Sequence, residues 1–176
     1  RFSKKGYWRP GLGFGGGHIE RGLKTFDRKL NTSYQNLIQG IINFNEKRID
    51  DFANYLMSYS KNLNDSRIGI LGLSYKKNSE SVFRSYATRF IQKIKKQKYP
   101  IFAYDPVAKF SKNFQNTYNV NQASKMHLVL EKSDILLVLC DWDIFKKIEF
   151  KHIKQNNIKL IVDPFNIYKK MKKIFL

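Results

Sequence analysis

The chain has 176 residues, of which 33 are Lys or Arg and 14 are Asp or Glu, so its formal net charge is +19. A hydrophobic fraction of 42% and an aromatic fraction of 15% are typical of a globular domain and exclude a simple basic tail or low-complexity arm. The charge indicates an anionic partner, for which nucleic acid, a membrane surface and a phosphorylated metabolite are all candidates.

The N-terminal third divides into a glycine-rich segment and a helical segment. Residues 1–22 show neither a helical nor a strand period, and five of their glycines fall within seven consecutive positions, where the backbone must be free in φ. Over 23–63, apolar residues recur at three- and four-residue spacing, which predicts a helix. The polar stretch 62–66 marks a boundary, so two domains are expected, 1–64 and 65–176.

The second domain alternates short apolar strands with helices. The strands are predicted at 67–73, 101–104, 134–140 and 159–163, and the helices at about 81–98, 123–131 and 143–155. Strands rich in Ile, Leu and Val that alternate with helices are typical of βαβ units and of a parallel sheet covered on both faces. We therefore expect the α/β class: a helical segment followed by a small Rossmann-like parallel-sheet domain.

The single cysteine, Cys140, lies in the apolar run 135–140. One cysteine excludes an intrachain disulfide and a multi-cysteine zinc site, and its apolar neighbours favour buried packing over a reactive thiol. No apolar stretch approaches the roughly 18–20 residues that a membrane span needs, and the N-terminus lacks a signal-peptide core. We therefore expect a cytoplasmic protein. Because the sequence begins at Arg1 in a motif-rich segment, we also expect a fragment of a longer chain.

Two segments carry candidate binding residues. The glycine loop (residues 11–17) can bring backbone N–H groups close to a phosphate or sugar, since no Cβ blocks the approach. It follows no strand and has no Walker lysine, and a flexible linker is the alternative, although Pro10 and nearby aromatic residues favour an ordered loop. The second segment, 69–77, ends a strand in glycine and continues at the carboxyl edge of the sheet, where open α/β sheets bind ligands. Alternatively, its lysines belong to the general lysine excess.

Five separated stretches resemble, in matching order, motifs of the UDP-glucose/GDP-mannose dehydrogenase family. The resemblance is to the C-terminal part of that family and covers essentially all 176 residues. Several motifs in the same order are far more specific than any one of them. The matching stretches are Tyr7–Gly17, Asn43–Glu46, Leu71–Lys76, Tyr104–Pro106 and Ser133–Phe145, and the family's final motif is echoed at Val162, Asp163 and Asn166.

The resemblance implies a fold and an activity. In the family, a Rossmann domain binds NAD, a helical central domain mediates dimerisation and a second α/β domain binds the nucleotide sugar. The C6 alcohol is oxidised twice through a thiohemiacetal on a cysteine, whose thiolate is a strong nucleophile. The chain would thus hold the end of the central domain and the whole substrate domain, and would form a homodimer through helix 23–63. NAD is implied for the intact enzyme, and no cofactor is expected for this chain alone.

The resemblance also implies site residues, and the catalytic positions depart from the family. His18 occupies the position of the nucleophile, and Arg21 and Gly22 stand where Lys and Asp are expected, so no residue is assigned a catalytic role. His127 and His152 are far from His18 in sequence, so no metal site is expected. The substrate-binding residues implied are Gly13, Phe14, Gly15, Gly16, Tyr75 and Lys76.

Two family arginines are also replaced. The arginine that helps to bind the cofactor aligns with Phe83, and Arg84 would substitute for it only after a shift of one residue. The arginine that contacts the substrate phosphates aligns with Phe165. The substrate side of the resemblance is therefore better kept than the cofactor side.

The leading hypothesis is a fragment or divergent member of a nucleotide-sugar 6-dehydrogenase, which binds a UDP- or GDP-sugar for polysaccharide precursor synthesis. The Arg-Pro-Gly and Leu-Ser-Tyr-Lys variants lean toward the GDP-mannose branch. The alternative is a catalytically inactive binding or scaffold protein. Nucleic-acid binding is a remote third hypothesis, because most aromatic residues fall at core-like spacings rather than beside the lysine clusters at 93–98 and 169–173. Those clusters fit a composition biased toward lysine.

Overall fold

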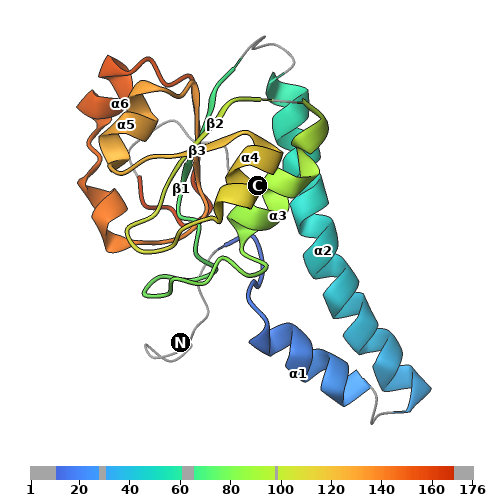
Figure 1. Ribbon diagram of the computed structural model, residues 1–176. Coiled ribbons are helices and arrows are strands. Elements are labelled where there is room, and N and C mark those ends of the chain that lie inside the picture. The colour runs from blue at the N-terminus through green and yellow to red at the C-terminus, as the bar shows by residue number, and fades with distance from the viewer. Residues whose placement is uncertain (1–10, 28–30, 61–65, 98, 169–176) are drawn as a thin grey trace.

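The structure is a computed structural model that describes residues 11–27, 31–60, 66–97 and 99–168 (Figure 1). Parts of the sequence predictions fall outside these residues. They are the stretch from Tyr7 to Pro10, most of the polar boundary at 62–66, Lys98, and the lysine cluster at 169–173.

Two helices stand where the sequence predicted one continuous helix over 23–63. Helix α1 spans His18–Asp27 and helix α2 spans Thr32–Ser60, so the single-helix prediction was wrong. Asn31 explains the start of α2, because its side-chain oxygen accepts a hydrogen bond from the backbone N of Tyr34 at 3.5 Å. Asparagine favours the N-cap position for this reason. Apolar spacing alone does not reveal such a cap, since the spacing continues beyond it.

The C-terminal half of α2 packs against the α/β domain, and its N-terminal half extends beyond that domain toward α1 (Figure 1). Ile49, Phe52 and Leu56 are buried, and the ring of Phe52 lies 5.2 Å from that of Phe90. Apolar side chains on the N-terminal half remain exposed. These residues, called the α2 stripe below, are Tyr34, Leu37, Ile41 and Phe44.

Five parallel strands form the sheet, in the order β3-β2-β1-β4-β5. Their bounds are β1 Ile68–Leu71, β2 Ile101–Tyr104, β3 Val120–Gln122, β4 Ile135–Val138 and β5 Leu160–Val162. In the register, Ile68 of β1 pairs with Ile101 of β2 and Ile135 of β4. Strand order runs from β1 toward β3 in one direction and then from β4 toward β5 in the other. The carboxyl ends of β1 and β4 therefore meet at a topological switch point, where such sheets bind ligands.

Helices cover both faces of the sheet, as predicted for the α/β class (Figure 1). On β4, Ile135 and Leu137 join the core shared with α2 and α3, whereas Leu136 and Val138 join the core on the opposite face. This alternation follows from the two-residue period of a strand. The helices are α3 Tyr86–Lys93, α4 Lys112–Tyr118, α5 Met126–Glu131 and α6 Phe150–Gln155, with 3-10 turns η1 Lys95–Gln97 and η2 Asp143–Lys147.

Several details differ from the prediction, among them the helix predicted at 143–155, which is the 3-10 turn η2 followed by the short helix α6. Helix α4 and strand β3 were not predicted, and α3 begins at Tyr86 rather than near 81. Ser85 sets that start, because its hydroxyl accepts from Thr88 N at 3.1 Å, while Arg84 before it adopts a left-handed φ of 50°. The division into domains 1–64 and 65–176 stays a prediction. Helix α2 shares one hydrophobic core with the sheet, so packing alone does not mark a boundary between them.

Candidate functional site

The glycine loop is fixed in place by two side chains of α2. Asn45, which is only 4% exposed, accepts from the backbone N of Phe14 at 2.8 Å and donates to its carbonyl at 3.0 Å. Arg48 donates to the carbonyl of Leu12 at 2.9 Å. At Gly13 the φ is 136°, and a Cβ there would lie 2.3 Å from the Asn45 side-chain oxygen. The loop is therefore ordered, as predicted, and the flexible-linker alternative is wrong.

The far end of the glycine loop packs against the segment that follows β1. A Cβ at Gly16, where φ is 72°, would lie 2.7 Å from the ring of Tyr75, and one at Gly15 would lie 2.9 Å from the carbonyl of Arg84. Both distances are shorter than any real Cβ contact, so only glycine allows this approach. The loop thus bridges α2 and the carboxyl edge of the sheet.

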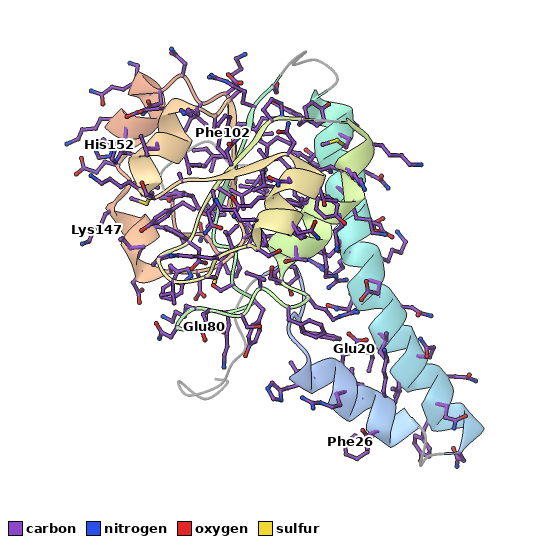
Figure 2. The ribbon with its side chains drawn as sticks, in the orientation of Figure 1. Glu20, Phe26, Glu80, Phe102, Lys147 and His152 are labelled. Carbon is purple, nitrogen blue, oxygen red and sulfur yellow. The ribbon has the colours of Figure 1, made fainter. Side chains whose placement is uncertain are left out.

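A cavity of about 740 Å³ lies where α1, the glycine loop and the segment 75–84 meet. It is large enough for a small ligand. Figure 2 shows Glu20 on the side of α1 that faces α2. The lining consists of Gly16, Gly17, His18, Glu20, Arg21, Lys24, Thr25, Tyr75, Ser79, Ser81, Phe83 and Arg84.

Ion pairs connect the cavity wall to α2. Arg84 contacts Glu20 of α1 at 2.7 Å and Glu46 of α2 at 2.5 Å. Lys24 pairs with Glu20 at 2.6 Å, and Arg89 pairs with Glu46 at 2.7 Å. The hydrogen bond from Lys24, aided by the charge of Arg84, holds the pKa of Glu20 below its usual value against the opposing effect of burial. These pairs hold α1 and α2 to the α/β domain.

His18, which the sequence motifs align with the family nucleophile, is the first residue of α1 and lines the cavity. Its ring Nδ1 lies 3.4 Å from the guanidinium of Arg21. Because a guanidinium can only donate, Nδ1 accepts this bond and the hydrogen of the neutral ring is on Nε2. Nothing in this arrangement supplies the thiolate on which the family chemistry depends.

The positions implied for cofactor contact do not fit NAD. Phe83, which the sequence motifs align with the cofactor arginine, is 63% exposed, and its ring lies 3.3 Å from where a Cβ of Gly17 would be. Arg84, the possible substitute, is engaged by Glu20 and Glu46. Neither side chain therefore offers a free cation for a dinucleotide.

The carboxyl edge of the sheet is organised around Asp105, which is buried. Its Oδ2 accepts from Leu73 N at 2.8 Å, Ser74 N at 3.1 Å, Ser74 Oγ at 2.9 Å and Trp142 Nε1 at 3.1 Å. Its Oδ1 accepts from two further backbone N–H groups, those of residues 107 and 108. Asp105 thereby fixes the start of the segment that presents Tyr75. The sequence analysis placed Asp105 after a strand and in a stretch that matches a family motif, but it assigned this residue no role in the site.

Cys140 has the buried packing role predicted for it. It lies against Gly72, where φ is 94° and a Cβ would come within 2.4 Å of the Cβ of Cys140. Burial raises the pKa of its thiol to about 12, from an ordinary value of 9.0, so the thiolate is not populated near neutral pH.

The residues implied as substrate-binding do not all reach the cavity. Gly16 and Tyr75 line it, whereas Gly13, Phe14 and Gly15 lie elsewhere in the glycine loop and Lys76 places its Nζ 5.5 Å from the Tyr75 ring centroid. The sequence reasoning missed Arg84, Glu20 and Ser81 as lining residues. Of these three residues, only Arg84 could have been found from the sequence, because it is a cation next to Phe83, the residue that aligns with the family's cofactor arginine.

Other predicted features have structural surroundings away from the cavity. Lys77 pairs with Asp143 at 3.3 Å, and Lys93 pairs with Asp50 at 2.7 Å. Phe165, in place of the phosphate-contacting arginine, packs its ring 3.3 Å from where a Cβ of Gly11 would lie. Within the described part of the chain, no helix has the length and apolar character needed to cross a bilayer.

The fold and site define a doubly wound α/β domain. Helix α2 holds the glycine loop, and this loop packs against the segment that follows β1 at the carboxyl edge of the sheet. A model of the UDP-glucose/GDP-mannose dehydrogenase family, UDP binding domain, matches residues 69–170, which is more than half of the chain. The chain therefore belongs to the UDP-glucose/GDP-mannose dehydrogenase family, as the sequence motifs predicted.

Relatives and solved structures agree on the part of the family that is matched. A UDP-glucose 6-dehydrogenase of Rickettsia bellii is 25% identical over 172 residues, covering 93% of this chain and 39% of that protein. A UDP-D-ManNAc dehydrogenase structure from Pyrococcus horikoshii superposes with a TM-score of 0.75 at 22% identity, covering 99% of this chain and 40% of that one. A GDP-mannose dehydrogenase structure from Pseudomonas aeruginosa superposes with a TM-score of 0.73 at 16% identity, covering 97% of this chain and 40% of that one. The chain thus spans about two fifths of their length.

Proposed function

We propose that this chain is the nucleotide-sugar-binding part of an NAD-dependent UDP-glucose/GDP-mannose 6-dehydrogenase, and that it binds a UDP- or GDP-sugar. The observation that carries the proposal is the position of the glycine loop. Asn45 fixes this loop by two hydrogen bonds to Phe14, and Gly16 of the loop packs against Tyr75 beside the cavity. The family model, described as a UDP binding domain, supports the same ligand class. We further propose a cytoplasmic location and a role in polysaccharide precursor synthesis.

Calorimetric titration tests this proposal directly. The full chain is titrated with UDP-glucose, GDP-mannose and ATP at one moderate salt concentration, so that general attraction of anions by the net charge is the same for all three. We expect at least one nucleotide sugar to bind more tightly than ATP. Equal or weaker binding of both nucleotide sugars would remove the proposal. The comparison of the two also tests the lean toward the GDP-mannose branch.

A second candidate function is a catalytically inactive nucleotide-sugar-binding or scaffold protein, and His18 favours it. A histidine at the nucleophile position cannot form the thiohemiacetal of the family reaction. With NAD+ supplied, we expect no NADH from the isolated chain with either nucleotide sugar, and none after His18→Cys, because Phe83 stands where the sequence motifs place the cofactor arginine. Absorbance at the NADH band measures this. Detectable turnover by the unmodified chain would exclude the inactive form, and turnover only after His18→Cys would show that the Phe83 position does not prevent the reaction.

We also propose that the chain forms a homodimer through the helix predicted at 23–63, now resolved as α1 and α2. The α2 stripe supports this, because four large apolar side chains, from 40% to 63% exposed, line one face of the helix. A contiguous exposed apolar face typically marks an interaction surface. A monomeric mass by light scattering would count against it.

A further inference from the structure

The charge on the cavity wall is not balanced. Three cations, Arg21, Lys24 and Arg84, line it together with one carboxylate, Glu20. Lys24 and Arg84 form ion pairs with Glu20 at 2.6 and 2.7 Å, and Arg84 pairs with Glu46 as well, so both cations are compensated. Among the residues that the structure describes, Arg21 has no carboxylate partner, and its side chain contacts only the ring of His18. The cavity therefore carries an uncompensated positive charge.

His18 and Arg21 together supply hydrogen-bond donors to this cavity. The ring of His18 uses Nδ1 to accept from Arg21, which leaves Nε2–H as a donor. The guanidinium has further N–H groups in a planar fork, which suits the two oxygens of a carboxylate. A neutral sugar alcohol offers only one oxygen at the same carbon and no charge.

The wall formed by the segment 75–84 adds hydroxyl donors. The Oγ of Ser79 accepts from Ser81 N at 3.2 Å, and the Oγ of Ser81 accepts from Phe83 N at 3.3 Å. Each serine uses an oxygen lone pair in these bonds and keeps its O–H hydrogen for a ligand. Donors therefore line both sides of the cavity.

We propose that this cavity binds the carboxylate of a sugar acid, so that the chain binds a nucleotide-linked uronic acid more tightly than the corresponding nucleotide-linked hexose. The proposal rests on the nucleotide-sugar binding proposed above and adds the oxidation state of the sugar. His18 and Arg21 supply donors to this cavity but no thiolate, and this favours holding an acid over oxidising an alcohol.

Titration of the full chain with UDP-glucose, UDP-glucuronate and UDP tests the proposal, since the two sugars differ only at C6. We expect UDP-glucuronate to bind about tenfold more tightly than UDP-glucose, the lower end of what one hydrogen bond to a charged group contributes. Arg21→Gln should remove this preference. Lys47→Gln is the matched control, because it deletes an exposed cation outside the cavity that Asp51 already compensates, and it should keep the preference.

Each other outcome overturns a defined part of the proposal. Equal affinity for UDP-glucose and UDP-glucuronate would refute the preference for an acid and leave the proposed function intact. UDP bound as tightly as UDP-glucuronate would mean that the cations hold phosphate instead. A preference that survives in Arg21→Gln would refute the role of Arg21 in binding the acid. If neither sugar nucleotide binds better than ATP, the proposed function fails as well.

Discussion

Replacement of Asp105 by asparagine should destabilise the α/β domain more than any other change of one atom at the carboxyl edge. Both oxygens of Asp105 accept only from N–H or O–H donors, six bonds in all. An amide keeps one acceptor and introduces a donor. Its better orientation leaves the oxygen with Leu73, Ser74 and Trp142 and turns the NH2 group toward two backbone donors.

The magnitude follows from those two donors, the N–H groups of Val107 and Ala108. Each loses its acceptor at 2.9 or 2.8 Å and then faces another donor. An unsatisfied buried donor costs about 1–3 kcal/mol, so Asp105→Asn should lower the free energy of unfolding by about 2–6 kcal/mol. The opposite orientation of the amide would disrupt more bonds and cost more.

Urea unfolding followed by far-UV circular dichroism measures this loss. The control is Asp143→Asn, because Asp143 is exposed and its pairs with Lys77 and Lys146 lie at the surface. Exposed pairs contribute up to about 1 kcal/mol. A loss of less than 1 kcal/mol for Asp105→Asn, or a loss no larger than that of the control, would refute the reasoning that Asp105 organises this edge.

Three further predictions follow from single contacts. Gly16→Ala should weaken nucleotide-sugar binding in calorimetry by an order of magnitude or more, because its Cβ would overlap the Tyr75 ring at a left-handed φ, whereas Gly40→Ala, which meets nothing within 4 Å, should not. Leu37→Glu should halve the mass in light scattering by placing a charge in the α2 stripe, and an unchanged dimer would exclude that surface. Arg67 donates to Asp134 and holds its pKa below the ordinary 3.8. The ionised carboxylate therefore stabilises the fold above pH 3.8, and this contribution disappears as the pH falls through the lowered pKa. Thermal unfolding should show that Asp134→Asn lowers the melting temperature at neutral pH and lowers it less in acid.

The sheet was predictable because its central strands are continuous apolar runs between polar turns. β1 and β4 are buried along their whole length, which only a sheet covered on both faces allows. The missed elements lack that signal. α4 has no buried residue, and β3 is a three-residue edge strand with an exposed Asn121 and a half-buried Gln122. Elements that bury little leave little trace in the apolar pattern.

The candidate site was predictable only in part, for a related reason. Five glycines within seven positions indicate a backbone that must approach other groups closely, and the structure shows such approaches at Gly13 and Gly16. The groups that they approach are Asn45 and Tyr75, which come from other parts of the chain. The contacts of Arg84 with Glu20 and Glu46 likewise join segments that only folding brings together. A single sequence gives no means of pairing them.

The residues that hold the site in shape differ in burial from the residues at the positions aligned with the family's catalytic and cofactor-binding residues. Asn45 and Asp105, which form several hydrogen bonds to backbone N–H groups or carbonyls, stand in stretches that match the family motifs. His18, Arg21 and Phe83, which depart from those motifs, are exposed and form few contacts. Replacing an exposed side chain usually changes stability by less than about 0.5 kcal/mol, whereas removing a buried hydrogen-bonding group costs several times more. The fold can therefore tolerate substitutions at exposed positions such as these, which line the cavity without holding the structure together.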